Sequence, residues 1–406
     1  MATPPQPPPG SVLDFLLNEP RYVPIFERIV HHLSPVDLVR FRRVNRALNA
    51  AVSTALRTQW SIDKALAHYF KDPEAFRNVL GQVSGVLSGG FALRFFDRLS
   101  NEEGEVWCRD LDVFVWGKQP ETELLTEYVR KEGHVSPQTI TEEPTTVSAY
   151  PSSPLSQLRD TSTPQVERYE LPTSDHAINI IFTPSPPIIT VLVLKGLFPL
   201  TAFANIITST KAYAPFAKWT FKAHRSYLLG PDSGGSNITP SLAICAATGR
   251  EVHDVEIASQ KRPQPHLGIR SLGDGQTWCI PLTTEGVTPP QLPDFVVDGT
   301  SFMIRARESG LFGRFGGAAN QHTDFYDVKV KEVEHVALEH PWIGLQEVKK
   351  RVHSALVLQL MAMPKETRPV DLEKFGVDSV MAQPKAFEPL SWLDGLVLEW
   401  VEEMTG

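Results

Sequence analysis

Hydrophobic positions in the first third of the chain alternate with polar ones in a way that predicts a strand, a helix and a second strand. The apolar run from Val86 to Ser88 predicts the first strand, and it ends on Gly89 and Gly90. Apolar residues at helical spacing follow the glycines and predict a helix. Along the next strand side chains alternate between the faces, so Asp110 and Asp112 share one face and their apolar neighbours face the core.

These residue types, in this order, suit a metal and phosphate site. Two carboxylates on one face can share a divalent cation. A turn of Ser88, Gly89 and Gly90 before a helix lets backbone amides approach a phosphate. This is the arrangement of a nucleotidyltransferase core, with Asp110 and Asp112 as metal-binding and catalytic residues. The alternative is a plain tight turn followed by an Asp-x-Asp at a strand edge.

Polymerase-like transfer also needs a third carboxylate on the following strand. That strand is predicted from His176 to Phe182, and its alternation places Asn179 where the acid would lie. An amide does not accept a proton at neutral pH and bridges a second metal poorly. Asp175 precedes Asn179 by four residues and falls beyond the strand end. We therefore expect a degenerate site, with the third carboxylate missing at Asn179.

The N-terminal pattern predicts two helices. Apolar residues at helical spacing run from Tyr22 to Leu33, and Ser34 with Pro35 starts a second helix that continues to Val52. Such a helical pair buries too little apolar surface to be a comfortable domain by itself. We expect it to pack on the rest of the chain or to bind a partner helix.

The middle of the chain continues the strand and helix pattern. The segment from Pro120 to Lys131 is predicted to be an amphipathic helix, and Ser136 to Pro164 a long loop rich in Ser, Thr and Pro. The most apolar stretch, Ile188 to Ile207, is interrupted by Lys195 and Pro199. It is predicted to be a buried helix rather than a membrane span.

Basic and aromatic residues interleave in the segment that follows. Basic side chains could contact phosphates and the rings could stack on bases. The same pattern is typical of the solvated and buried faces of one helix, which is the interpretation we favour. The residues concerned are Lys211, Lys218, Lys222, His224 and Arg225, with Tyr213, Phe216, Trp219 and Phe221.

The C-terminal part predicts an irregular region of strands and turns that closes with helices. A glycine-rich run from Gly310 to Gly317 lacks the Gly-Lys-Ser/Thr ending of a phosphate loop, so a flexible loop is predicted. The histidines show no ligand spacing, so core or solvated histidines are favoured over metal ligands at His31, His32, His322 and His335. The predicted strands are Trp278–Leu282, Phe295–Val297, Phe302–Arg305 and Phe325–Val330, and the predicted helices are Leu345–Leu360 and Leu390–Val401.

Composition and charge narrow the classes of protein. With 406 residues, 42% hydrophobic and 21% charged, the chain is long enough for two or three globular domains. A net charge of -8 without a long Lys/Arg run argues against general nucleic-acid binding. Three widely spaced cysteines form neither a disulfide framework nor a zinc signature, which favours the cytoplasm or nucleus. The Pro-rich start is no secretory signal.

The segment from Pro20 to Leu38, followed by Arg43 to Ala47, resembles an F-box, the motif that docks substrate receptors onto the small adaptor subunit of cullin-RING ubiquitin ligases. The shared features are the early proline, the Leu-Ser-Pro-x-Asp-Leu turn and a Val-x-Arg in the second helix. F-boxes commonly start with Leu-Pro, where this chain has Val23 and Pro24. The alternative is a helical hairpin that caps the next domain. The resemblance implies adaptor contacts at Pro24, Ile29, Leu33, Pro35, Leu38 and Val44.

A second resemblance covers roughly half of the chain and depends on the order of its motifs. The chain is similar to a large group of fungal proteins that look like nucleotidyltransferase-fold domains, some of them behind an F-box-like segment. This resemblance implies an architecture and not a reaction. The matching motifs are Asp72–Arg77, Ser88–Arg98, Asp110–Val115, Ile178–Ile181, Lys211–Tyr213, Thr220–Phe221 with His224–Arg225, and Arg270–Trp278.

Together these observations predict an α/β (α+β) chain in four parts. We expect a disordered Pro-rich tail over 1–19, an F-box-like helical segment over 20–60, a nucleotidyltransferase-like mixed sheet with flanking helices over 61–230, and a mixed C-terminal region over 231–406.

The expected function is that of an intracellular protein-interaction protein. It would be an F-box-type ubiquitin-ligase adaptor that carries an inactive nucleotidyltransferase-like domain, a pseudoenzyme able to recognise a partner or a nucleotide. The alternative is an enzyme that uses Mg²⁺ and a nucleoside triphosphate to move a nucleoside monophosphate onto a hydroxyl acceptor. Neither membrane association nor general nucleic-acid binding is expected.

Overall fold

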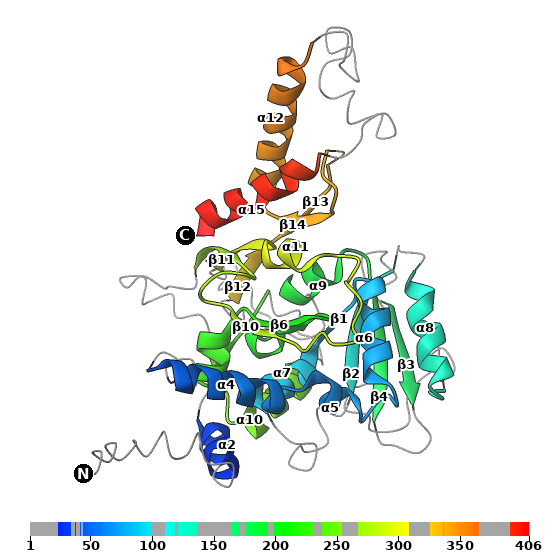
Figure 1. The fold of residues 1–406 in the computed structure, drawn as a ribbon, viewed down its shortest axis with the longest axis vertical. Coiled ribbons are helices and arrows are strands. Elements are labelled where there is room, and N and C mark those ends of the chain that lie inside the picture. The colour runs from blue at the N-terminus through cyan, green and yellow to red at the C-terminus, as the bar shows by residue number, and fades with distance from the viewer. Residues whose placement is uncertain are drawn as a thin grey trace, which may run out of the picture.

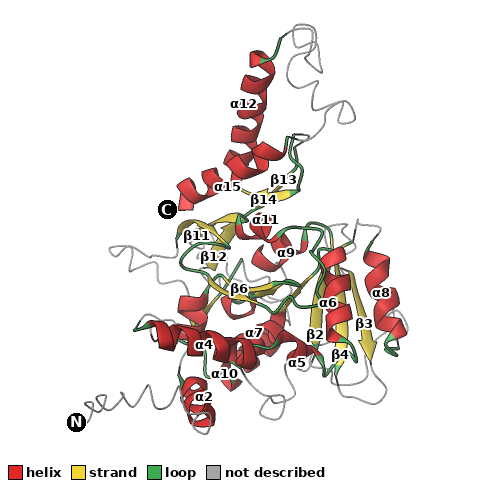
Figure 2. Cartoon of the chain, viewed as in Figure 1, coloured by secondary structure: helices red, strands yellow, loops and turns green. Residues whose placement is uncertain are grey.

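The computed structural model describes residues 23–33, 37, 41, 44–98, 110–117, 121–135, 165–170, 176–193, 199–230, 238–253, 267–307, 325–335, 337–364 and 390–405. These residues form the mixed α/β architecture that the sequence predicts, with helices packed around a central sheet (Figure 1). Figure 2 shows strands in the centre of the molecule and helices at both chain ends. Two closing helices form an arm at the C-terminal end (Figure 1).

Helices lead into the first strand of the sheet, but the predicted second helix is wrong in its continuity. Instead of running unbroken from 34 to 52, the chain leaves helical geometry at Val44 and Asn45. The Asn45 side chain then accepts a hydrogen bond from the Leu48 amide at 2.8 Å, which caps the next helix. Asp72 caps a later helix in the same way. The helices are α2 (Val23–His32), α4 (Arg46–Gln59), α5 (Ile62–Leu66) and α6 (Pro73–Gln82).

The described chain forms a seven-stranded mixed sheet with the strand order β10-β6-β5-β1-β2-β4-β3. β2 and β4 are parallel, and the other neighbouring strands are antiparallel. The predicted strands around 86–88, 110–115 and 176–182 are confirmed, whereas the edge strand β3 was not predicted. The strands are β1 (Val86–Ser88), β2 (Leu111–Trp116), β3 (Gln165–Glu170), β4 (Ala177–Thr183), β5 (Ile206–Ile207), β6 (Lys211–Ala214) and β10 (Trp278–Pro281).

One face of this sheet is covered by helices and carries apolar side chains. A Cβ atom on Gly85 would lie 2.8 Å from Leu80 of α6 and 3.3 Å from Val115 of β2, so α6 packs closely on the face that Val115 occupies. Figure 1 shows α6 and α8 (Thr122–Lys131) in front of β2, β4 and β3. Side chains alternate along a strand, so Asp112 points to the opposite face from Val115.

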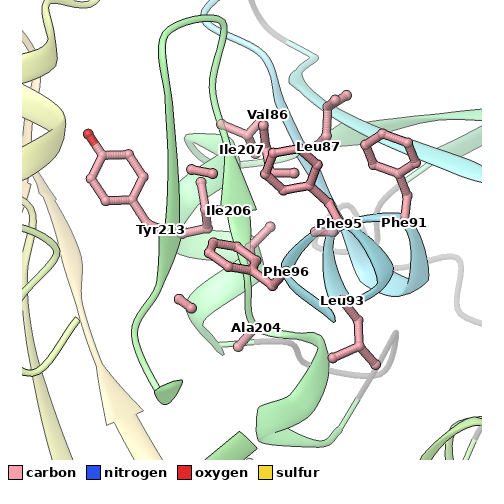
Figure 3. Close-up of a cluster of buried hydrophobic side chains, with 14 of the residues drawn as sticks. Val86, Leu87, Phe91, Leu93, Phe95, Phe96, Ala204, Ile206, Ile207 and Tyr213 are labelled. Carbon is pink, nitrogen blue, oxygen red and sulfur yellow. The ribbon is translucent and has the colours of Figure 1, made fainter. Parts of the chain in front are cut away.

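Helix α7 (Gly89–Asp97) brings three phenylalanines into the core beside β1 and β5 (Figure 3). Phe91, Phe95 and Phe96 are all buried, and Phe95 and Phe96 lie beside Ile206 and Ile207. Burying side chains of this size stabilises the fold by about 1.5–3 kcal/mol each. The helical spacing after the glycine pair therefore predicted the helix, whereas its burial on all sides, from Gly89 to Phe96, was not predicted.

The apolar stretch from 188 to 207 is not one buried helix, so that prediction is wrong beyond Val193. Helix α9 (Pro187–Val193) covers only its beginning, and its end forms the short turn Thr201–Phe203 and strand β5. Pro199 cannot donate a helical hydrogen bond, and β5 gains its partners from β1 and β6. Among the described helices, none has both the length and the apolarity to cross a membrane.

The segment from 211 to 225 is likewise not a single helix. It consists of strand β6, a π-helical turn η5 (Lys218–Lys222) and strand β7 (Arg225–Tyr227). The predicted division between faces is confirmed, because the aromatic residues are buried and most of the basic ones are exposed.

The region after residue 230 contributes one strand to the seven-stranded sheet and forms smaller sheets of two or three strands. β10 lies in the seven-stranded sheet, which therefore extends across the domain boundary predicted at 230/231. The predicted strand at 295–297 is wrong, because Pro293 and Asp294 start a short helix there. The elements are α10 (Ile238–Ala247), β8 (Glu251–His253), β9 (Gly268–Ser271), α11 (Asp294–Asp298), β11 (Ser301–Arg307), β12 (Phe325–Lys329), β13 (Lys331–Val333), β14 (Trp342–Gly344), α12 (Gln346–Ala362) and α15 (Ser391–Thr405).

Polar contacts tie α11 to the sheet, while the closing helices have an apolar cluster of their own. The Tyr213 hydroxyl donates to Asp298 Oδ1 at 2.7 Å, and Lys211 Nζ lies 2.7 Å from Asp298 Oδ2. Burial, with the nearby Asp298 charge, raises the pKa of Tyr213.

The helices α12 and α15 pack on a separate cluster that includes Trp342 and Leu393. The helices predicted near 345–360 and 390–401 are confirmed.

Candidate functional site

A row of polar side chains crosses four neighbouring strands of the central sheet. Ser88 of β1 is in register with Asp112 of β2, Asp112 with Asn179 of β4, and Asn179 with Arg168 of β3. Residues directly opposite one another on paired strands point to the same face. The structure therefore brings together three residues that the sequence selected and one that it did not. We call these four residues the polar row.

Asp112 is the most buried carboxylate of the site, at 1% exposure. Its Oδ1 accepts a hydrogen bond from Asn179 Nδ2 at 2.9 Å. The other end of that amide, Oδ1, lies 3.3 Å from Arg168 Nη1, which donates to it. A donor on one side and an acceptor on the other set the orientation of the Asn179 amide. Asn179 thus serves Asp112 as a hydrogen-bond donor, at the position where an active site would hold a third acid.

Asp110 is held by an arginine. Arg168 Nη1 lies 2.6 Å from Asp110 Oδ2, and Arg168 Nε lies 3.1 Å from Glu170 Oε1. Burial by itself would lower the pKa of Arg168, but the hydrogen bonds and charges of Asp110 and Glu170 raise it above its usual value. The guanidinium therefore stays charged and acts as the counter-ion of Asp110.

Ser88 and the two glycines form a direct transition from strand to helix. α7 begins at Gly89 immediately after β1, and Gly89 has φ +68°, a left-handed conformation that favours glycine. The Ser88 hydroxyl donates to the carbonyl oxygens of Asn205 at 2.6 Å and of Phe203 at 3.1 Å. It is therefore engaged in the core. Gly89 and Gly90 are both buried, and they directly follow Ser88, which is in register with Asp112.

These residues do not fit a divalent cation as the structure arranges them. Asp110 already has a guanidinium at hydrogen-bond distance, and Asp112 faces an amide N–H. Both are positively polarised groups that a cation would have to displace. In the described part of the chain, no three His, Cys, Asp or Glu side chains are grouped so that they could hold a metal ion.

Arg168 is the residue that sequence reasoning missed. It lies on β3, whose side chains are mostly exposed or half-buried, so that the segment shows no apolar alternation typical of a strand. The available signal was that Val166, Arg168 and Glu170 are two residues apart, which in a strand places the charges of Arg168 and Glu170 on one face. Only the pairing of β3 with β4 brings that face to Asp110.

The predicted adaptor contacts lie partly on exposed positions of the N-terminal helices. Ile29 of α2 is 40% exposed and Val44 is 64% exposed, whereas Leu33 is half-buried against the core. Phe26 and Val30 of α2 are buried and face the body of the protein. Pro35 and Leu38 fall outside the described residues, and of Pro24 only its place in α2 is described.

One arginine attaches α2 to the central domain. Arg98 ends α7 and donates from Nη1 to the Val30 carbonyl at 2.9 Å and from Nη2 to the Leu33 carbonyl at 2.7 Å. These carbonyls belong to the last turn of α2, where a cation is favoured. Arg98 also donates to Gln59 of α4 and lies 4.8 Å above the Trp60 ring. The same residue therefore contacts both N-terminal helices.

His335 is a buried histidine, which is one of the two alternatives that the sequence predicted for it. Its ring is buried and lies 5.9 Å from the ring of His353. Burial, assisted by His353 and Lys349, lowers the pKa of His335 to about 4. The side chains of His31 and His32, and residue His322, fall outside the described part.

A shallow, open hollow of about 290 Å³ lies elsewhere, between α12 and α15. Leu358 and Trp400 contribute its apolar lining, and no residue of the polar row borders it. It is therefore a feature of the C-terminal arm and separate from the predicted site.

Comparisons of the chain with protein-family models, with curated proteins and with solved structures gave no match.

Proposed function

We propose that this chain is an F-box-type adaptor of a cullin-RING ubiquitin ligase whose nucleotidyltransferase-like domain recognises a partner and transfers no nucleotide. It would act in the cytoplasm or nucleus. The observation that carries the proposal is that both carboxylates of the predicted metal site already have hydrogen-bond partners. Arg168 donates to Asp110, and Asn179 donates to Asp112. Exposed apolar residues at the predicted adaptor contacts support the docking role.

The geometry of α2 suits a docking helix. Phe26 and Val30 pack inward, while Ile25 and Ile29 of the same helix remain exposed. A helix that is anchored on one face and apolar on the other can bind a partner groove without leaving the body. Val44, in the break before α4, adds a further exposed apolar side chain.

The polar row, as the described residues arrange it, does not offer the groups that phosphoryl transfer requires. Transfer needs carboxylates that hold Mg²⁺ and a base that activates the attacking hydroxyl. Here the guanidinium of Arg168 neutralises Asp110, and the amide of Asn179 cannot take up a proton. The remaining carboxylate, Asp112, is buried. The domain is therefore suited to a structural or recognition role.

The docking role is tested by changing two exposed apolar residues to charged ones. We expect Ile29→Glu/Val44→Glu to lose binding to the purified adaptor subunit of a cullin-RING ligase, because a glutamate cannot enter an apolar groove without a large desolvation cost. The matched control is Leu124→Glu/Leu358→Glu, since Leu124 and Leu358 are 43% and 68% exposed. The measurement is surface plasmon resonance. Equal binding by both variants, or none by the parent chain, would contradict the proposal.

The alternative function remains a Mg²⁺-dependent nucleotidyltransferase. Its support is the register that brings Ser88, the residue before the glycine pair, beside Asp112. Calorimetry of the full chain with Mg²⁺ and each nucleoside triphosphate distinguishes the two functions. We expect no metal-dependent heat of binding. Binding that requires Mg²⁺ and disappears in Asp110→Asn would instead favour the enzyme.

A further inference from the structure

The turn between β6 and β7 carries a basic surface in an acidic protein. Although the chain has 47 Asp and Glu residues and a net charge of -8, no acidic residue occurs from His176 to Pro231. Within that stretch Lys218, Lys222, His224 and Arg225 are all exposed. We call these four residues the basic patch. In the described part of the chain, no ion pair joins Lys218, Lys222 or Arg225 to a carboxylate.

The backbone beneath the basic patch has unusual local geometry. Lys218 to Lys222 form a single π-helical turn, a rare feature that is frequent at functional sites. His224 has φ +49°, a left-handed conformation that is uncommon outside glycine. Such geometry persists where the surrounding structure enforces it, and it concentrates at binding and switch regions. Two independent backbone features thus coincide with the basic side chains.

The aromatic residues of the same segment form a rigid support for the patch. Trp219 stacks on Phe216 with ring centroids 5.6 Å apart, and it lies 4.9 Å from Tyr326. Phe221 contacts Phe96 at 5.4 Å, and the guanidinium of Arg250 lies over the Phe221 ring. Lysines that project from a turn held in this way lose little backbone entropy when they bind a partner.

We propose that the basic patch docks an acidic polypeptide segment of a partner protein. Single-stranded nucleic acids are usually held by exposed aromatic rings as well as by cations. Here Trp219 and Phe221 are buried and offer no stacking surface. Lysine ammonium groups bind as point charges, which suits carboxylates on a mobile segment. The acidic residue Glu251 of β8 is in register with Arg225 of β7. Its Oε2 lies 3.0 Å from His253 Nε2, so its carboxylate is engaged with that histidine.

The proposal is tested on the full chain by fluorescence anisotropy with two labelled probes of equal net charge, an oligoglutamate peptide and an oligothymidylate. We expect the peptide to bind at low ionic strength and to dissociate as salt is added. Lys218→Glu/Lys222→Glu should weaken peptide binding at least about tenfold. The matched control is Lys64→Glu/Lys329→Glu, which changes two exposed lysines elsewhere and should bind like the parent chain.

Three outcomes would overturn the proposal. The first is equal peptide binding by Lys218→Glu/Lys222→Glu and the parent chain, and the second is no peptide binding by the parent. The third is oligothymidylate binding that is as tight as peptide binding and is lost in the same variant, which would make the patch a nucleic-acid surface. The neutral variant Lys218→Gln/Lys222→Gln should give intermediate affinity, which separates a charge effect from misfolding. Ile29→Glu/Val44→Glu should leave peptide binding unchanged, so failure of the adaptor proposal is distinguishable.

Discussion

Asn179 is the residue on which the proposed inactivity of the central domain depends. It stands in register with Asp112 and hydrogen-bonds to it, so one side chain both completes the polar row and removes the acid that catalysis would need. An amide in this position stabilises a buried carboxylate by donating a hydrogen bond to it. A carboxylate there would lie beside the Asp112 carboxylate, and the only cation next to it among the polar row, Arg168, is already paired with Asp110.

Replacing Asn179 with Asp should therefore make stability depend on pH. Two carboxylates at hydrogen-bond distance raise the pKa of the pair above its value in the unfolded chain. A raised folded-state pKa means that stability is retained at low pH and lost as the pH rises above about 4. We expect Asn179→Asp to lose about 1–3 kcal/mol relative to the parent at neutral pH.

Chemical unfolding at several pH values measures this effect. Asn179→Ala is the control, because it removes the hydrogen bond to Asp112 without adding a charge, so its loss of stability should vary less with pH than that of Asn179→Asp. Added Mg²⁺ should restore part of the stability of Asn179→Asp, since it would neutralise the new pair. A constant difference between Asn179→Asp and the parent chain across the pH range would show that the two side chains do not face each other.

At the scale of elements, buried side chains and one arginine attach α2 to the body. Its inward residues reach the core, and Arg98 binds the carbonyls of Val30 and Leu33 at its C-terminal end. Arg98 itself has a left-handed backbone, φ +59°, which a glycine would adopt more easily. The Arg98 side chain therefore stabilises the attachment of α2, while its backbone conformation is unfavourable at the end of α7.

The variant Arg98→Gly separates the two effects. It should relieve the backbone at the end of α7, a gain of up to about 1 kcal/mol, and at the same time release the last turn of α2. We expect faster hydrogen exchange in α2 and unchanged exchange in β2 and β4, read by mass spectrometry. Uniformly faster exchange throughout the sheet, or unchanged protection of α2, would contradict this role of Arg98.

At the scale of the whole molecule, the central sheet depends on a strand from the second half of the sequence. β10 pairs with β6 along Trp278 to Pro281, and the Trp278 ring contacts Trp60, Phe96 and Phe221. The ion pair between Arg250 and Asp97 at 2.7 Å adds a second connection to α7. The residues up to 230 therefore do not contain all of their own core.

A chain ending at residue 230 should fail to unfold cooperatively, because it exposes β6 as an edge and leaves a gap where Trp278 packs. A chain ending at residue 344 keeps the complete sheet and should unfold cooperatively, with a lower midpoint owing to the loss of α12 and α15. Thermal unfolding followed by circular dichroism tests both truncations. Parent-like cooperative unfolding of the shorter chain would show that β10 is dispensable.

Local patterns determined many of the elements and part of the candidate site. The alternation around Asp112 and Asn179 predicted both strands and the place of Asn179 on the strand that follows Asp112, because the period of a strand depends only on neighbouring residues. The helical spacing after Gly89 predicted α7 in the same way, but not that it is buried on all sides. These features are written within a few residues of the chain.

Tertiary structure decided the features that depend on residues far apart in sequence. Arg168 reaches Asp110 only because β3 pairs with β4. The sequence predicted the strand β10, but its local pattern did not show that this strand joins the central sheet. The short apolar run at 295–297 became a helix, and 211–225 became a strand, a turn and a strand, because short runs take the form that their distant neighbours allow. Hydrogen bonds between strands and the pairing of buried charges are long-range, so no local pattern encodes them.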